Sequence, residues 1–264
     1  GGGQALCGGL RPISSLIFQF FKESERNDPA RVGSGFIKSR IRNILYSFAD
    51  VLICQTDDAK NYFPDYIRKK VFIILNPIMS GLPSKQEKVR DKVIVNFCRL
   101  NKQKNIPLLI SAFEEFCNIH PDYELHIYGD GAEKETILDI IYSKHLERII
   151  KVFPNTPNVH ELVINAAMFV STSDFEGLSN SMLEALSMGL PTICTDCPCG
   201  GARMVIEDGV NGFLIPVNNQ KSLVDKMLLI AGSSELTIKL SNNALKINNK
   251  LNVDNICKQW ISLL

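Results

Sequence analysis

The feature that most constrains this chain is the regular alternation of short apolar runs with helical patterns from Lys92 onward. Apolar runs bounded by turn residues are typical of buried strands, and apolar residues at helical spacing are typical of helices that cover a sheet. Strands that alternate with helices in this way predict an α/β fold with a parallel sheet and helices on both faces. The expected strands are residues 92–98, 123–128, 149–153, 168–173, 191–195 and 212–216.

The helices expected between these strands place the functional residues at one edge of the sheet. They cover residues 106–119, a stretch from Gly131 through Lys144, residues 159–166 and a stretch from about Ser179 to Met188, and two or three helices close the chain. Ligands of parallel sheets bind at the carboxyl ends of the strands, where the strand order reverses. We therefore look for function in the loops after Cys98, Tyr128, Phe153 and Ser173.

The first ninety residues show fewer such units. Helices are expected at 36–49 and 57–63, and strands at 51–55 and 71–75. A Rossmann-like domain needs roughly 100–150 residues, so residues 1–80 are expected to be a remnant of an N-terminal, acceptor-side domain. The remaining boundaries expected are a linker at 81–91, a complete second domain at 92–250 and a closing helix at 251–264 that packs back toward the first domain.

Composition excludes several classes of protein. The net charge is +1, with 45% apolar and 22% charged residues, which is ordinary for a globular protein and argues against a nucleic-acid partner. Neither a signal peptide nor a membrane span is expected, which favours the cytoplasm. Eight cysteines without framework spacing fit a reducing compartment. Cys194, Cys197 and Cys199 could bind zinc, but reduced thiols are favoured because no histidine is near.

The segment from Ser173 to Gly189 carries the strongest chemical signal. It is expected to run from a strand through a glycine loop into a helix, whose free N–H groups suit a phosphate or sugar oxygen. Glu176 in the loop and Glu184 in the helix can both accept hydrogen bonds from hydroxyl groups. An alternative interpretation is structural, because Ser181-x-x-Glu184 has the spacing of a capping box.

Glu176 and Glu184 resemble the Glu-x7-Glu signature of retaining glycosyltransferases of the GT-B fold, and their context is similar to family 4, the glycosyl transferases group 1. The resemblance extends from about Ser24 to the C-terminus. It rests also on the order of several weaker motifs: Glu25-Arg26-Asn27-Asp28-Pro29, Gln55-Thr56-x-Asp58-Ala59, Arg99-Leu100, Gln103-Lys104-Asn105, Ile127-Tyr128-Gly129-Asp130-Gly131 and Asp208-Gly209-x-Asn211-Gly212.

The resemblance implies a role for each motif residue. Glu176 would be the catalytic residue, in contact with the transferred sugar, and Glu184 would bind the ribose. Arg99 and Lys104 would hold the diphosphate, for which a guanidinium and an ammonium group are well suited; solvated surface cations are the alternative. The remaining donor-binding residues implied are Gly129, the base loop with Val152 and Phe153, and the phosphate-binding backbone of Gly177, Leu178 and Ser179.

The activity implied is transfer of a hexosyl unit, with retention, from a UDP- or GDP-sugar to a saccharide or lipid-linked acceptor in surface glycan synthesis. The resemblance implies neither metal nor cofactor, and a cytoplasmic setting with peripheral contact at the inner membrane face as one option. The alternatives are a fragment that binds donor with little catalysis, and a dehydrogenase. The last is disfavoured because Lys134 stands where the Gly129-x-Gly131 motif would need its third glycine.

Overall fold

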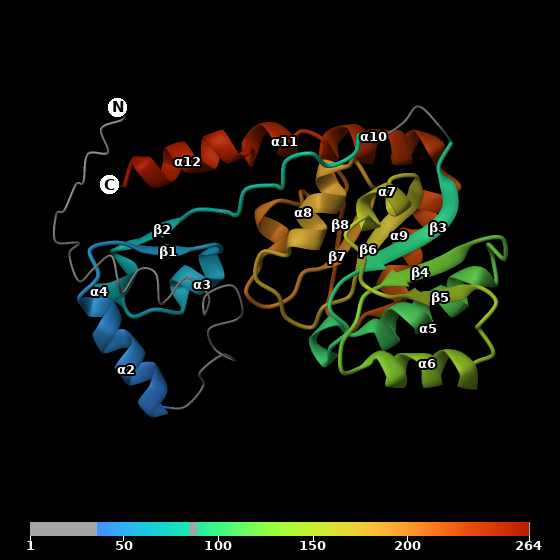
Figure 1. Ribbon diagram of the computed structural model, residues 1–264, viewed down its shortest axis with the longest axis horizontal. Helices are drawn as coiled ribbons and strands as arrows, with labels where there is room; N and C mark the ends of the chain where they lie inside the picture. The colour runs from blue at the N-terminus through green and yellow to red at the C-terminus, as the bar shows by residue number, and fades with distance from the viewer. Residues whose placement is uncertain (1–35, 85–88, 264) are drawn as a thin grey trace, which may run out of the picture.

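The computed structural model describes residues 36–84 and 89–263, and contains two parallel sheets (Figure 1). The strands are β1 (Leu52–Cys54), β2 (Val71–Ile73), β3 (Asp91–Phe97), β4 (Glu124–Tyr128), β5 (Ile150–Phe153), β6 (Ala166–Ser171), β7 (Thr192–Thr195) and β8 (Phe213–Ile215). The helices are α2 (Phe36–Ser47), α3 (Asp57–Asn61), α4 (Asp65–Arg68), α5 (Ile106–Cys117), α6 (Lys134–Ser143), α7 (Val159–Val163), α8 (Asn180–Ser187), α9 (Gln220–Gly232), α10 (Ser234–Ala244), α11 (Ile247–Lys250) and α12 (Val253–Ile261), with 3-10 turns η2 (Lys102–Lys104) and η3 (Ala202–Met204).

The larger sheet has six strands in the order β5-β4-β3-β6-β7-β8, and all of its pairs are parallel. The chain builds outward from β3 through β4 to β5, and then returns to the other side of β3 with β6. The strand order therefore reverses between β3 and β6. In doubly wound sheets a ligand crevice lies outside the carboxyl ends of the strands at such a point.

Two apolar cores cover the two faces of this sheet. Successive strand residues point to opposite faces: Ile94 of β3 lies in the core beneath α5, α6 and α9, whereas Val95 lies in the core beneath α7 and α8. In β6, Met168 and Phe169 are divided in the same way. All six residues of β6 are buried, which explains why this strand has a continuous apolar sequence.

The N-terminal part is smaller and packs around a third apolar cluster. β1 and β2 pair in parallel, and Tyr46 of α2 is buried with Phe63 against them. The Arg42 guanidinium of α2 lies 4.9 Å from the ring centroid of Tyr62, which follows α3, so this cation packs against an aromatic ring of the N-terminal part. Ile44 of α2 and Phe48 just after this helix are nevertheless exposed.

Two segments join the N-terminal part to the larger sheet, and they lie side by side. Residues 74–84 leave β2, and Ile74 and Ile78 are buried in the core beneath α7 and α8. The Ile78 N–H donates to the carbonyl of Leu251, 2.8 Å away, beside the start of α12. Helix α12 then extends back along the N-terminal part (Figure 1).

The boundaries of several expected elements differ from the structure. The helix expected at 159–166 ends at Val163, because Ala166 pairs with Asp91 and already belongs to β6. The one-turn helix α4 was not expected, and four helices close the chain rather than two or three. The domain boundaries stay a prediction, and the motif of residues 25–29 lies outside the described residues.

Arg90, just before β3, forms hydrogen bonds that connect the amino end of this strand to neighbouring elements. Its guanidinium donates to the carbonyls of Ala166 at 2.9 Å and Gly189 at 2.5 Å and to the Ser241 hydroxyl at 3.0 Å. Desolvation by burial lowers the pKa of Arg90 to about 10, so these bonds must offset the cost of burying a cation.

We expect Arg90→Met to lower the free energy of unfolding by about 2–4 kcal/mol, since it leaves buried acceptors without donors. Urea unfolding followed by circular dichroism measures this loss. Arg148→Met, at an exposed arginine, is the control and should change stability by less than about 0.5 kcal/mol. Equal stability of the two variants would contradict the role of Arg90.

Candidate functional site

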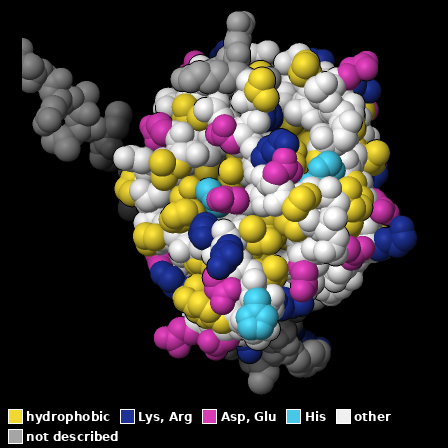
Figure 2. Space-filling model, turned by 90° about the vertical axis from the view of Figure 1, so that its right-hand side faces the viewer, with side chains coloured by type: hydrophobic (Ala, Val, Ile, Leu, Met, Phe, Trp, Pro, Cys, Tyr) yellow, Lys and Arg dark blue, Asp and Glu magenta, His cyan; other side chains and the backbone are white. Residues whose placement is uncertain are grey.

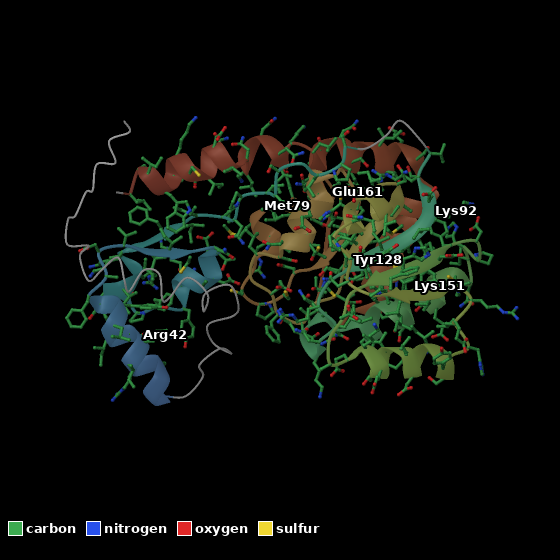
Figure 3. The ribbon with its side chains drawn as sticks, in the orientation of Figure 1. Arg42, Met79, Lys92, Tyr128, Lys151 and Glu161 are labelled. Atoms are coloured by element: carbon green, nitrogen blue, oxygen red, sulfur yellow. The ribbon has the colours of Figure 1, made fainter. Side chains whose placement is uncertain are left out.

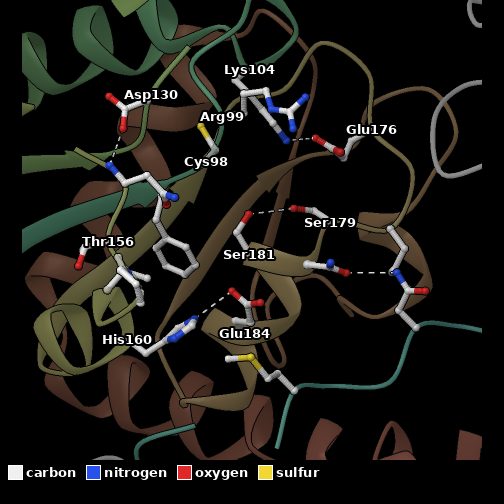
Figure 4. Close-up of a pocket in the computed structure, with 18 residues that line it drawn as sticks. Cys98, Arg99, Lys104, Asp130, Thr156, His160, Glu176, Ser179, Ser181 and Glu184 are labelled. Atoms are coloured by element: carbon white, nitrogen blue, oxygen red, sulfur yellow. Dashed lines mark hydrogen bonds and ion pairs between the residues drawn. The ribbon is translucent and has the colours of Figure 1, made fainter. Parts of the chain in front are cut away.

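A cavity of about 830 Å³ opens where the strand order reverses, at the carboxyl ends of β3, β4, β5 and β6 (Figure 4). All four loops expected to carry function contribute to its wall. Six of the predicted site residues line it: Arg99, Lys104, Glu176, Leu178, Ser179 and Glu184. A volume of this size is in the range of small-molecule sites in proteins.

Hydrogen bonds join the loop after β3 to the loop after β6 across this point. Asn105 adopts a left-handed conformation, with φ of 45°, and its side-chain amide donates to the Asp174 carboxylate at 2.8 Å. The Gln103 side chain donates to the Phe175 carbonyl at 2.7 Å, and the Thr172 hydroxyl donates to the Lys104 carbonyl at 2.9 Å. These contacts hold the backbone on both sides of the cavity in a fixed arrangement.

Lys104 and Glu176 form an ion pair in the cavity wall (Figure 4). Their side chains are only 13% and 18% exposed, and the Ser173 hydroxyl also donates to Glu176, at 3.2 Å. The Arg99 side chain is exposed at the rim and forms no hydrogen bond or ion pair within residues 36–84 and 89–263. The site thus offers one free cation and one cation that a carboxylate already neutralises.

Helix α8 points its N-terminus into the cavity, as the sequence predicted. Its N-cap is Ser179, whose hydroxyl accepts from the Met182 N–H and lies 3.1 Å from the Ser181 hydroxyl. The capping-box interpretation of Ser181 and Glu184 is therefore wrong, because the cap lies two residues earlier and Glu184 falls beyond the third helical position. The Glu184 carboxylate therefore does not cap this helix.

Glu184 instead meets a histidine. The Glu184 Oε2 atom lies 3.0 Å from Nε2 of His160 on α7, and both residues line the cavity. His160 was not among the predicted residues, because its partner lies on another element and no local motif reveals it. Asn76 and Met79, on the segment after β2, were also missed, and both line the cavity; Figure 3 shows Met79 between the N-terminal part and the larger sheet.

The three donor-binding residues expected at the ends of β4 and β5 are not part of the wall of the cavity. Gly129, Val152 and Phe153 do not line it; the Phe153 ring instead stacks on Tyr128 with centroids 4.8 Å apart. A glycine is needed at position 129 because the chain after β4 passes close to the chain after β3: a Cβ there would lie 2.0 Å from the Cys98 carbonyl oxygen. The wall is formed by Asp130 and by residues 155–157, and the Asp130 carboxylate accepts from the Asn155 N–H at 2.8 Å.

Gly177 also lies outside the main cavity, in a small adjoining one that it shares with Glu176. Its carbonyl touches Gly201, where a Cβ would lie 1.8 Å from the Gly177 oxygen. The Glu176 N–H donates to the Pro198 carbonyl at 3.2 Å. The loop after β7 therefore supports the loop that carries Glu176.

The cysteines near the site are thiols. Burial raises the pKa of Cys98 to about 12 and that of Cys197 to about 11, so neither is a nucleophilic thiolate at neutral pH. Within the described residues no three histidine, cysteine or acidic side chains lie close enough together to hold a metal ion. The zinc interpretation of Cys194, Cys197 and Cys199 thus has no support from the structure.

The fold and the crevice place this protein among the α/β proteins of the GT-B type. The UDP complex of Anabaena HepE is similar over 90% of this chain and 70% of its own, with a TM-score of 0.81 at 20% identity. Residues 82–247 match the family Glycosyl transferases group 1, and the chain belongs to that family.

Two curated relatives illustrate the family. Poly(ribitol-phosphate) alpha-N-acetylglucosaminyltransferase of Staphylococcus aureus is 30% identical over 66% of this chain and 35% of its own length. The N-acetylgalactosamine-N,N'-diacetylbacillosaminyl-diphospho-undecaprenol 4-alpha-N-acetylgalactosaminyltransferase of Campylobacter jejuni is 28% identical over 76% of this chain and 56% of its own. The chain thus spans less than two thirds of the length of these relatives.

Proposed function

We propose that the protein binds a nucleoside-diphosphate sugar, with UDP as the nucleotide, and transfers the sugar to a hydroxyl group with retention at the anomeric carbon. One observation carries the proposal: Arg99, Lys104 and the N-terminus of α8 converge on one cavity together with Glu176 and Glu184. Cations and a helix N-terminus favour a diphosphate. The two carboxylates favour hydroxyl-rich groups on either side of it.

Each group has a distinct part in this proposal. Arg99, Lys104 and the free N–H groups of α8 stabilise the negative charge that grows on the leaving diphosphate. Glu176, beside Lys104, lies at the sugar and stabilises the positive charge that develops at the anomeric carbon. Glu184 accepts from the ribose. Residues 155–157 hold the base, in place of Val152 and Phe153. The chemistry so described uses neither a metal nor a cofactor.

UDP is favoured over GDP by analogy. HepE binds UDP in its solved complex, and that protein shares the fold. The acceptor class is inferred in the same way: one relative acts on poly(ribitol-phosphate) and another on a diphospho-undecaprenol glycan. We therefore propose a surface-polymer or lipid-linked acceptor, at the cytoplasmic face of a membrane.

Membrane contact stays a prediction with one structural correlate. Ile41 and Ile44 on α2 and Phe48 just after it are 54%, 59% and 70% exposed, and an exposed apolar surface flanked by cations suits the interfacial region of a bilayer. In the described part of the chain no helix has the length and apolar content to cross a membrane.

Titration calorimetry with UDP, GDP and NAD tests the nucleotide. We expect UDP to bind with the largest affinity, GDP more weakly and NAD not at all, because the cavity offers a diphosphate site but lacks the glycine pattern of a dinucleotide fold. Release of free UDP from a panel of UDP-sugars then separates a transferase from a protein that only binds donor. Binding of NAD alone would contradict the proposal.

A further inference from the structure

We propose that His160 is a positioning residue for ribose recognition, which fixes the Glu184 carboxylate so that it can accept from a ribose hydroxyl. The inference rests on the proposed function, because it takes Glu184 as the ribose acceptor. It assigns to His160 a role that acts through Glu184 and requires no contact of the imidazole with the nucleotide.

The contact between His160 and Glu184 indicates which ring nitrogen of the histidine carries a hydrogen. His160 Nε2 lies 3.0 Å from Glu184 Oε2, with the side chains 12% and 21% exposed (Figure 4). An ionised carboxylate only accepts hydrogen bonds. The Nε2 atom must therefore carry the proton and donate it toward Glu184.

The imidazole is held in place by packing. Its ring meets the buried ring of Phe97 edge to face, with centroids 6.0 Å apart and an interplanar angle of 86°. Val159 and Val163 of the same helix are buried in the core beneath α7 and α8, so the short helix cannot turn its histidine away without exposing them. A donor fixed in this way restricts the rotamers of Glu184.

This pair joins two separate parts of the cavity. His160 follows the loop of residues 155–157, where we place the base, and Glu184 lies on α8, whose N-terminus faces the diphosphate. One oxygen of Glu184 is engaged by His160. The other forms no hydrogen bond with any described residue and is left for a ribose hydroxyl, which lies between base and diphosphate in any nucleotide.

A direct contact between His160 and the phosphates is the competing role, since the ring also lines the cavity. The two roles predict different ligand preferences. A histidine that bound phosphate would contribute equally to UDP and to its deoxyribose analogues. A histidine that positions Glu184 contributes only when the ribose hydroxyl is present.

The test compares His160→Gln with His160→Met on the full chain, by calorimetry with UDP, 2′-deoxy-UDP and 3′-deoxy-UDP. Glutamine places an amide donor about where the imidazole Nε2 lies, whereas methionine has similar bulk and no donor. We expect His160→Met to weaken UDP binding about tenfold, as for the loss of one hydrogen bond to a charged group. One of the two deoxy analogues should bind the unaltered protein more weakly than UDP does, because it lacks the hydroxyl that Glu184 recognises. His160→Met should weaken the binding of that analogue by less than about twofold. His160→Gln should restore most of the preference for ribose.

His120→Gln is the control, because His120 stacks on Phe116 outside the cavity. The His120→Gln variant should prefer UDP over its deoxy analogues as strongly as the unaltered protein does. Melting curves confirm that each variant is folded. Equal weakening of UDP and both deoxy analogues by His160→Met would overturn the positioning role while leaving UDP recognition intact. Failure of the unaltered protein to bind UDP would overturn the proposed function and this inference together.

Discussion

Replacing Lys104 with methionine should weaken UDP binding by about 30- to 100-fold, which corresponds to the loss of a hydrogen bond between charged groups. Two effects act in the same direction. The ammonium group no longer meets the diphosphate, and Glu176 loses the cation with which it forms an ion pair. An unpaired carboxylate at 18% exposure then repels the incoming phosphates.

Calorimetry with UDP and with uridine measures this prediction, since uridine lacks the phosphates and should bind both proteins equally. Lys144→Met is the matched control. Lys144 also forms an ion pair with a glutamate, Glu114, at 2.6 Å, but this pair lies outside the cavity and its loss should leave UDP affinity unchanged. A similar loss of affinity in both variants would indicate a general charge effect instead of a phosphate site.

Glu176→Gln is expected to have opposite effects on nucleotide affinity and on sugar transfer. UDP should bind about 3- to 10-fold more tightly, because the substitution removes a negative charge next to the diphosphate and releases Lys104. Release of UDP from a UDP-sugar should fall at least about 100-fold, because a neutral amide cannot stabilise a positive charge at the anomeric carbon.

The two readouts need parallel measurement on one protein preparation. Calorimetry gives the affinity, and a coupled assay for free UDP gives the turnover. Glu114→Gln breaks the surface pair with Lys144 and should alter neither. Weaker UDP binding by Glu176→Gln would show that the carboxylate supports the nucleotide site structurally, and unchanged turnover would remove it from the chemistry.

Much of the fold could be predicted because the strands of a parallel sheet are short, apolar and separated by helices. Each of the six strands of the larger sheet overlaps its expected range. The boundary between α7 and β6 was misplaced because apolar residues continue from the helix into the strand. The stretch from Val163 to Ala166 was expected to end a helix, but the pairing of Ala166 with Asp91 assigns Ala166 to β6. Such pairing joins residues far apart in sequence and leaves no local signal.

The candidate site could be predicted only where the chemistry follows a local pattern. Arg99, Lys104, Glu176 and Glu184 lie next to strand ends or a helix start, and the structure brings them to one cavity. His160 lies in ordinary helical sequence and Asn76 lies in the segment just after β2, so their positions at the cavity depend on tertiary packing. The cap at Ser179 could not be distinguished from one at Ser181 by spacing, because both serines lie at the start of the same helical pattern.

The paired crossing between the two parts of the molecule has a mechanical consequence. The chain passes from the N-terminal part to the larger sheet through residues 74–84 and returns with α12, and the two passages touch where the Ile78 N–H meets the Leu251 carbonyl. A covalent link and a packed helix that run side by side resist twisting more than the covalent link alone does, yet they still permit bending about the line on which they touch. Asn76 and Met79 stand next to this line and in the wall of the cavity. Of the residues that line the cavity, these two lie on the segment that leaves the N-terminal part, so bending of that part is transmitted to the crevice through their side chains.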